Sequence, residues 1–323
     1  MRIEADGVAV ECLPQAGFTI TAITDMVSGA NALWTRGGFS PAAPGYVLGP
    51  SGEASIESFS DLFVGGWFEM FPTAGYPGTL QGSVGPARSL LHGEVMRLPW
   101  DLIEQSTTAV EATVATIRTP FRLTRRLAIE SAQLVIRETI ENVGRVPVPY
   151  VWGHHPCFSR QTFAGGRLEL DAASSLVPGP VFDEANNTLV AGAAFEFPQA
   201  PTNTGAMRDV AHIPVDADGR HEQSSVVLRS GGLRITAPSL GRAFSLHWDV
   251  GDFPFALIWQ DYQARDAAFW GTCDTFAVEP SSAPGRSLDD AVAAAAIRHL
   301  EPGTARSLEL RAMWRPLDRD APA

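Results

Sequence analysis

The sequence predicts an all-β protein, a large antiparallel β-sandwich with one or two short helices. Short runs of residues alternate apolar and polar side chains at period two, as strands with one buried face do. The 30 glycines and 24 prolines fall mostly between these runs, where turns need them. The 323 residues can bury a sizeable core, and we expect one domain over 1–323.

The strands are expected from the N-terminus onward. VAVECLP and FTITAI are short β-type runs over 8–14 and 18–23, and Gly17 divides them. Alternating runs broken by Pro120 and by an SAQ step predict an antiparallel meander with strands at 109–117, 121–129 and 133–143. Further strands are expected at 225–230, 233–238, 244–250, 255–261 and 305–314. The weakly patterned residues 183–222 are expected to form long loops over one end of a sheet.

One helix is expected over 287–300, with the sequence SLDDAVAAAAIRHL. Ser287 fits an N-cap, and Asp289 and Asp290 fall in the first turn, where the helix dipole favours negative charge. The basic residue Arg298 lies near its end, where positive charge is favoured.

Charge and composition exclude several classes of function. The formal net charge of −12 argues against nucleic acid or an anionic membrane as the main partner, since both favour basic patches. All 24 basic residues are arginine, which excludes Schiff-base chemistry and a phosphate-loop lysine. The three scattered cysteines predict neither a disulfide framework nor a zinc site. No segment has the pattern of a signal peptide or a membrane span, so we expect a cytoplasmic protein, as a monomer or homodimer.

Four stretches combine rare residue types with glycine or proline. They are GGWFEMFPTAG, LHGEVMRLPW, GHHPCF and VEPSSAPG, at 65–75, 91–100, 153–158 and 278–285. Each has a structural explanation when taken singly, because histidines beside turns and tryptophans are more often core or surface residues than catalysts. The combination indicates acid–base catalysis, since histidine titrates near neutral pH and a carboxylate is its usual partner in such reactions.

In their order and spacing, the four stretches resemble those of the aldose 1-epimerase (galactose mutarotase) family. The resemblance extends from FTITAITDMVSGANALW near the start to HLEPGTARSLEL near the end. It implies a large antiparallel β-sandwich with a sugar cleft across one sheet, a small-molecule carbohydrate as partner, and interconversion of the α and β anomers of a free sugar. It implies neither a metal nor an organic cofactor, and the sequence shows no cluster of metal-ligand type.

The resemblance also implies which of two adjacent histidines faces the cleft. Neighbouring residues on a strand point to opposite faces, so only one of His154 and His155 can do so. The family motif G-x-H-P-x-F places its histidine immediately before Pro156, which selects His155. His154 is then expected to pack on the other face, and a β-bulge would exchange the two.

By the same resemblance, Glu279 is the base that removes the C1 hydroxyl proton and His155 is the acid that protonates the ring oxygen. An ionised glutamate favours a protonated histidine beside it, so we expect each to stabilise the working form of the other. Arg97 is expected to hold a sugar hydroxyl or to orient Glu94, and core packing is the alternative for Trp259. The expected substrate-binding residues are His92, Arg97, Trp67, Glu69 and Trp259.

The sequence departs from the family pattern in several places. The stretch SDLFVGG lacks the arginine that many relatives have there, and only Val64 and Glu69 are available. The tyrosine common after the catalytic histidine is Cys157 here. Asp209 and Asp216 are both candidates for the mid-chain aspartate that binds a sugar hydroxyl. The sugar itself is therefore left open.

Three other functions are also left open by these residues. A non-catalytic sugar-binding or regulatory protein would share the fold and would need no acid–base pair. A hexose-6-phosphate mutarotase would need clustered arginines, for which Arg88 and Arg97 are the candidates. A glycoside hydrolase or lyase usually has two opposed carboxylates, whereas the sequence shows one persuasive candidate.

Overall fold

Strands dominate the structure, which is a computed structural model that describes residues 1–37, 52, 54–82, 85–179, 186–265, 269–284 and 287–317. Within this part of the chain, one antiparallel sheet contains 17 strands, and smaller two-stranded sheets lie beside it. The predicted all-β class is confirmed.

In the N-terminal half, the elements are β1 Arg2–Ala5, β2 Val8–Leu13, β3 Thr19–Asp25, β4 Ala30–Asn31, α1 Ala54–Leu62, β5 Trp67–Met70, β6 Thr79–Gly82, β7 Gly85–Arg88, η1 Val95–Arg97, β8 Asp101–Gln105, β9 Ala109–Ala115, β10 Phe121–Glu130 and β11 Gln133–Asn142. In the C-terminal half, they are β12 Val148–Tyr150, β13 Gly153–Ser159, β14 Leu168–Leu176, β15 Ala194–Phe195, β16 Gln199–Pro201, β17 Met207–Asp209, β18 His221–Ala237, η2 Pro238–Leu240, β19 Arg242–Trp248, β20 Phe255–Tyr262, β21 Asp274–Ser281, α2 Leu288–Ala293, β22 Arg298–Leu300 and β23 Ala305–Pro316.

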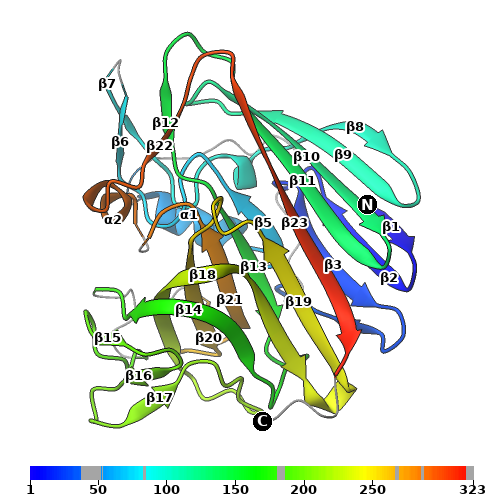
Figure 1. The fold of residues 1–323 in the computed structure, drawn as a ribbon, viewed down its shortest axis with the longest axis vertical. Helices are drawn as coiled ribbons and strands as arrows, with labels where there is room; N and C mark the ends of the chain where they lie inside the picture. The colour runs from blue at the N-terminus through cyan, green and yellow to red at the C-terminus, as the bar shows by residue number, and fades with distance from the viewer. Residues whose placement is uncertain are drawn as a thin grey trace.

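The large sheet doubles over, so that its two halves face each other across the main core (Figure 1). One half runs through β9, β10, β11, β23 and β19. The other runs through β20, β21, β13 and β5, with β3, β2 and β1 beyond it. Val10 and Ile20 from the second half share one buried cluster with Leu127 and Ile136 from the first. This is the two-layered arrangement that the period-two pattern predicts.

Strand β18 joins the two halves. Its residues 221–227 pair with β20, and its residues 232–237 pair with β19. Between these segments, a Cβ on Gly231 would come within 2.2 Å of the carbonyl oxygen of Trp248. Only a residue without a side chain fits where the strand crosses from one half to the other.

Most of the predicted strands are confirmed, with two differences. The runs predicted at 225–230 and 233–238 form the single long strand β18. Part of the predicted loop region 183–222 contains β15 and the short β16–β17 hairpin, while 183–185 lie outside the described residues.

The helices differ more from the prediction. Ser287 caps α2 with the predicted capping box to Asp290, but the helix ends at Ala293. Residues 298–300 instead form β22, which pairs with β12, so strand pairing replaces the expected last turns. Helix α1 was not predicted, because ASIESFSDL is short and rich in residues of modest helix propensity.

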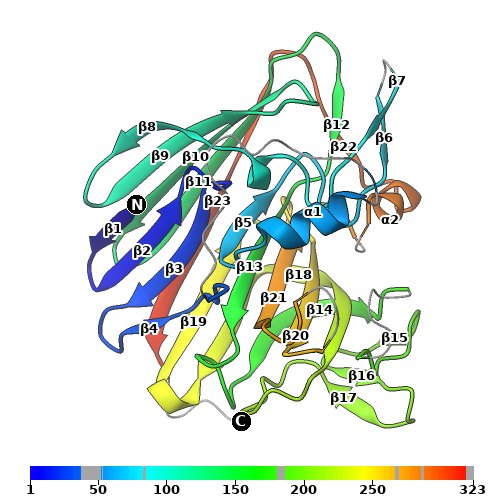
Figure 2. The ribbon, with the colours of Figure 1, turned by 180° about the vertical axis from the view of Figure 1, so that it is seen from behind.

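Helix α1 covers the face of the sheet that turns away from the main core. Figure 2 shows α1 crossing in front of β5 and β13. Its buried residues Ser55, Ser58 and Phe59 follow the i, i+3, i+4 spacing of one helical face. Phe59 and the following Phe63 belong to a second apolar cluster, which also includes Trp259 on β20. The candidate site lies under this cover.

Candidate active site

Strand β13 points its two histidines to opposite faces. His154 is opposite Glu69 in the pairing with β5, and His155 is opposite Phe68. The Nδ1 atom of His154 accepts a hydrogen bond at 3.3 Å from Nε1 of Trp67, a residue of the main core. The ring of His155 stacks on Phe68 on the other face, with centroids 4.6 Å apart. The histidine selected by the sequence motif therefore lies under α1.

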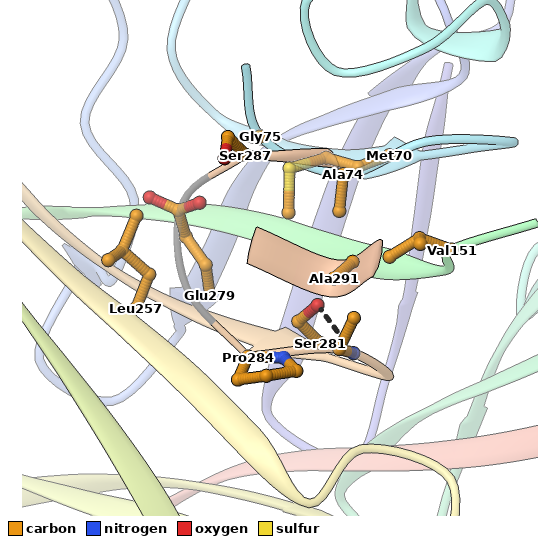
Figure 3. A pocket seen from close by; sticks show the side chains of 11 residues that line it. Met70, Ala74, Gly75, Val151, Leu257, Glu279, Ser281, Pro284, Ser287 and Ala291 are labelled. Carbon is orange, nitrogen blue, oxygen red and sulfur yellow. Dashed lines mark hydrogen bonds between the residues drawn. The ribbon is translucent and has the colours of Figure 1, made fainter. Parts of the chain in front are cut away.

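The side chains of His155 and Glu279 are in contact. Nε2 of His155 is 3.3 Å from Oε1 of Glu279, which lies on β21. Glu279 also borders a cavity of about 20 Å³. Figure 3 shows its carboxyl group directed into that space, near Leu257 and Gly75. This volume has room for about one water molecule. The structure brings the two predicted catalytic residues together in a buried position.

Burial sets the charge state of this pair. Glu279 is 3% exposed and His155 is 4% exposed, and removal from water disfavours the charged form of each. Burial therefore raises the pKa of Glu279 well above its ordinary value and lowers the pKa of His155 to about 3. Both shifts favour a protonated carboxyl group beside a neutral imidazole, whereas the sequence analysis expected a carboxylate beside an imidazolium.

The raised pKa of Glu279 predicts a pH-dependent effect on stability. Above the ordinary glutamate pKa of 4.5, the unfolded chain releases a proton that the folded chain retains. The free energy of unfolding contributed by Glu279 is thus present below that pH and is lost as the pH rises through the folded pKa. Glu279→Gln cannot lose this proton. We expect the variant to gain stability relative to wild type between about pH 5 and pH 8 in urea unfolding. A pH-independent difference would contradict the buried neutral carboxyl group.

His92 is the second imidazole beside the pair. Its ring centroid is 5.1 Å from that of His155, and its φ of 57° is rare for a residue other than glycine. Burial first, and then the charges of His155 and Arg97, hold the pKa of His92 well below its ordinary value. Its Nδ1 accepts a hydrogen bond from the backbone N–H of Gly75 at 3.3 Å. The neutral ring therefore carries its proton on Nε2, the form that a hydrogen-bond donor to a sugar requires.

Arg97 connects the HGEVMR segment to helix α1. Its guanidinium group donates hydrogen bonds to Oγ of Ser58 and to the carbonyl oxygen of Ser55, each at 2.9 Å. The hydroxyl of Ser55 accepts another from the backbone N–H of Leu91. Arg97 is engaged in holding α1, which corrects its expected role in binding a sugar hydroxyl. The carboxylate of Glu94 accepts hydrogen bonds from residues 117–119.

Aromatic side chains close the site from the α1 side. The ring of Phe59 lies 5.0 Å from that of His92, and the ring of Phe63 lies 6.1 Å from that of His155. Trp259 lies at the site as expected, with its ring 5.7 Å from that of His155. The two phenylalanines are contributions that the sequence analysis missed, and the only signal for them is their spacing of four residues.

Trp67 and Glu69 lie on the face of β5 that turns away from the candidate site. Trp67 is fully buried in the main core. Oε1 of Glu69 accepts a hydrogen bond at 2.6 Å from Nε1 of Trp152, another core residue. Because side chains alternate along a strand, neither residue reaches the space beside His155. This corrects the prediction that they bind substrate.

Glu69 instead belongs to a buried charge cluster inside the sandwich. Nε of Arg125 is 2.8 Å from Oε1 of Glu138, and Nε2 of His154 is 3.1 Å from Oε2 of the same carboxylate. Burial acts to raise the pKa of Glu138, but His154 and Arg125 more than offset it, and the pKa lies below its ordinary value. Burial and the charge of Glu138 raise the pKa of Glu69. The cluster thus favours the ionised form of Glu138 and the protonated form of Glu69.

The remaining candidates lie elsewhere. Asp209 forms an ion pair with Arg167 at 2.7 Å, and Asp216 and Arg88 are exposed. In the described part of the chain, no group of three or more His, Cys, Asp or Glu side chains could hold a metal ion. No helix among the same residues has the length and apolar character needed to cross a bilayer.

Solved structures of other proteins share this architecture. No family model and no curated protein sequence matches the chain. The Slr1438 protein from Synechocystis sp. PCC 6803 superposes with a TM-score of 0.69 at 16% identity, over 98% of this chain and 95% of that one. A galactose mutarotase-like protein from Lactobacillus casei does so with a TM-score of 0.66 at 16% identity, over 98% and 99%. This chain has the galactose mutarotase-like fold.

The galactose mutarotase-like fold extends along the whole chain. A galactose mutarotase related enzyme from Lactobacillus acidophilus superposes over 100% of this chain and 99% of its own, with a TM-score of 0.67 at 12% identity. The resemblance inferred from the motifs is therefore confirmed at the level of the fold. At such identities the likeness is one of architecture, so the activity has to be argued from the site residues.

Proposed function

We propose that this protein is an aldose 1-epimerase-like mutarotase, an isomerase that interconverts the α and β anomers of a free aldose or modified sugar. The observation that carries the proposal is the distance of 3.3 Å between Oε1 of Glu279 and Nε2 of His155. Ring opening needs a base for the C1 hydroxyl and an acid for the ring oxygen. Two groups held at one small site supply both.

The pair shares one proton, which is enough for the two proton transfers of this reaction. Transfer of the carboxyl proton of Glu279 to Nε2 of His155 gives a carboxylate and an imidazolium without a change in net charge. Sugar hydroxyls that hydrogen-bond to these groups favour the charged forms, which burial alone disfavours. Glu279 then takes the C1 hydroxyl proton, and His155 gives its Nε2 proton to the ring oxygen. The bond between C1 and the ring oxygen breaks as the C1 carbonyl forms, and reclosure on the other face reverses both transfers.

Two further residues would orient the sugar. His92 would donate from Nε2 to the ring oxygen or to a neighbouring hydroxyl. Trp259, whose Nε1 donates to Nε2 of His221 at 2.7 Å, presents a fixed ring beside His155. Its apolar face suits the C–H face of a sugar.

Helix α1 covers the imidazoles, and we propose that it moves when a sugar binds. Phe59 and Phe63 fill the space above the imidazoles. Gly65 and Gly66 follow the helix with φ of 73° and 74°, a conformation that favours glycine, and they are a suitable hinge.

Weakening the attachment of α1 should increase opening of the site. In Arg97→Met the two hydrogen bonds to Ser55 and Ser58 are lost, and bonds to charged groups contribute roughly 1.5–3 kcal/mol each. We expect alkylation of Cys157, which lies in the cluster under α1, to become at least about tenfold faster. Cys12 lies in the main core and should react as in wild type.

Mass spectrometry after timed alkylation distinguishes the two cysteines, and Arg122→Met, an exposed arginine, is the matched control. Faster reaction of Cys12 as well would indicate general destabilisation. An unchanged rate at Cys157 would mean that Arg97 does not hold α1 closed.

The proposed function is tested by anomer-exchange NMR with the wild-type protein and a panel of free sugars. We expect exchange faster than the spontaneous rate for at least one sugar. Binding of a sugar without faster exchange would favour the alternative, a non-catalytic sugar-binding protein on this fold. Exchange of hexose 6-phosphates alone would identify the phosphate-specific alternative.

A further inference from the structure

Cys157 contacts the side of His155 that faces away from Glu279. Its Sγ lies 3.2 Å from Nδ1 of His155, while Nε2 lies 3.3 Å from Glu279. The two residues are two positions apart on β13 and therefore share a face of the sheet. All three side chains are buried, and the imidazole ring is stacked on Phe68. Each ring nitrogen thus has one polar neighbour.

We infer that Cys157 is a positioning residue whose sulfur accepts a hydrogen bond from Nδ1–H of His155 and so keeps the ring proton on Nδ1. The inference rests on the proposed function for its catalytic meaning and goes beyond it in naming the atom that stays protonated. With Nδ1 occupied, only Nε2 can take and give a proton, and Nε2 is the nitrogen that faces Glu279. A base oriented by a third group in this way is a recurring arrangement in acid–base sites.

The neutral state of the closed site agrees with this tautomer. Burial raises the pKa of Glu279, so its carboxyl group carries a proton that needs an acceptor. The lone pair of Nε2 is available at 3.3 Å only when the ring proton is on Nδ1. The hydrogen bonds then run in one direction, from the carboxyl O–H to Nε2 and from Nδ1–H to the sulfur. When the carboxyl proton moves to Nε2, the bond from Nδ1 is unchanged.

The order cysteine, histidine, glutamate also occurs in enzymes with a nucleophilic thiol, but the surroundings of Cys157 exclude that role here. The thiol is fully buried. Burial first, and then the charge of Glu279, raise its pKa well above the ordinary value. The un-ionised thiol is a poor nucleophile, so the sulfur acts as an acceptor.

The inference is tested by NMR of the ring nitrogens in protein labelled with ¹⁵N-histidine. Two-bond proton–nitrogen spectra near neutral pH show which nitrogen carries the proton, and His155→Gln assigns the signals by their loss. We expect Nδ1 of His155 to be protonated in wild type and in Cys157→Ser, whose hydroxyl can also accept. In Cys157→Ala only the bond with the Glu279 carboxyl group still favours Nδ1–H, and we expect the fraction of His155 protonated on Nε2 to rise.

Kinetics of sugar exchange provide a second readout. We expect Cys157→Ala to lower kcat by about tenfold with KM within about twofold, a small part of the roughly 10²–10⁴ that acid–base groups supply. Cys157→Ser should stay within about threefold of wild type. A proton on Nε2 in wild type, or the same fraction of Nε2–H in Cys157→Ala as in wild type, would overturn the inference. If the alanine variant does not fold, the wild-type and serine spectra still test the inference, because both are expected to show the proton on Nδ1 of His155.

The NMR result does not depend on turnover. The expected change of tautomer in a protein that exchanges no sugar would uphold the positioning role and reject the proposed function. Sugar exchange without the expected change of tautomer in Cys157→Ala would support the proposed function and reject the positioning role.

Discussion

Glu279→Gln is expected to reduce anomer exchange by about 10²–10⁴, the contribution typical of a positioned acid–base group. Glutamine has the shape of glutamate and cannot take up the C1 hydroxyl proton. Because burial raises the pKa of Glu279 and so favours its neutral form, the substitution by a neutral amide suits the buried position. The fold and the affinity for the sugar should therefore survive while the exchange rate falls.

Two measurements separate these effects. Anomer-exchange NMR gives the rate, and titration calorimetry with the same sugar gives the affinity. Glu301→Gln, at an exposed glutamate, is the matched control and should exchange as wild type. A Glu279→Gln protein that binds the sugar and exchanges it at the wild-type rate would reject Glu279 as the base. His155→Gln should lose a similar amount, and the double variant little more, because the two groups act as a unit.

Arg125→Met is expected to destabilise the protein by about 3–5 kcal/mol, the usual effect of removing one partner of a buried ion pair. The Arg125 and Glu138 side chains are 0% and 1% exposed, with Nε and Oε1 at 2.8 Å. Without Arg125, the Glu138 carboxylate is left inside the sandwich with His154 as its remaining partner. Removing both charges in Arg125→Met/Glu138→Leu should recover much of the loss, because well-packed apolar residues often replace a buried pair without cost.

The same two strands contain a matched control. Arg122 and Glu141 are opposite each other on β10 and β11, as Arg125 and Glu138 are, but their side chains are 54% and 40% exposed. Arg122→Met should therefore cost at most about 1 kcal/mol. Urea unfolding followed by tryptophan fluorescence measures both. Equal losses at the buried and exposed positions would mean that the buried pair contributes no more than a surface pair.

The period-two pattern was sufficient to predict most of the strands. The meander from 109 to 143 forms β9, β10 and β11 nearly as expected. This pattern is local, because each strand needs one face for the core and one for the outside. The helices were less predictable. Helix α1 is stabilised by Phe59 and by the attachment of Ser55 and Ser58 to Arg97, and these contacts are invisible in its own short sequence.

The candidate site could be predicted in part. The motif before Pro156 selected His155, and alternation along β13 then placed His154 in the core. The same reasoning could not choose a face for β5, since either Trp67 and Glu69 or Phe68 and Met70 could turn toward the cleft. That choice depends on the register between β5 and β13, in which His155 is opposite Phe68. Register depends on two segments that are distant in sequence, so it could not be predicted from either segment alone.

The sequence alone predicted the all-β class from period-two alternation. It predicted the histidine and glutamate of the candidate site from motifs that resemble those of a known family, since both kinds of pattern are read within single segments. The tertiary structure decided three other things: which side of β5 meets the site, that α1 covers it, and that the histidine–glutamate pair is buried. The physical reason is that register, closure and burial each arise from several segments at once. Phe59, His155 and Glu279 are far apart along the chain, and only folding removes them together from water.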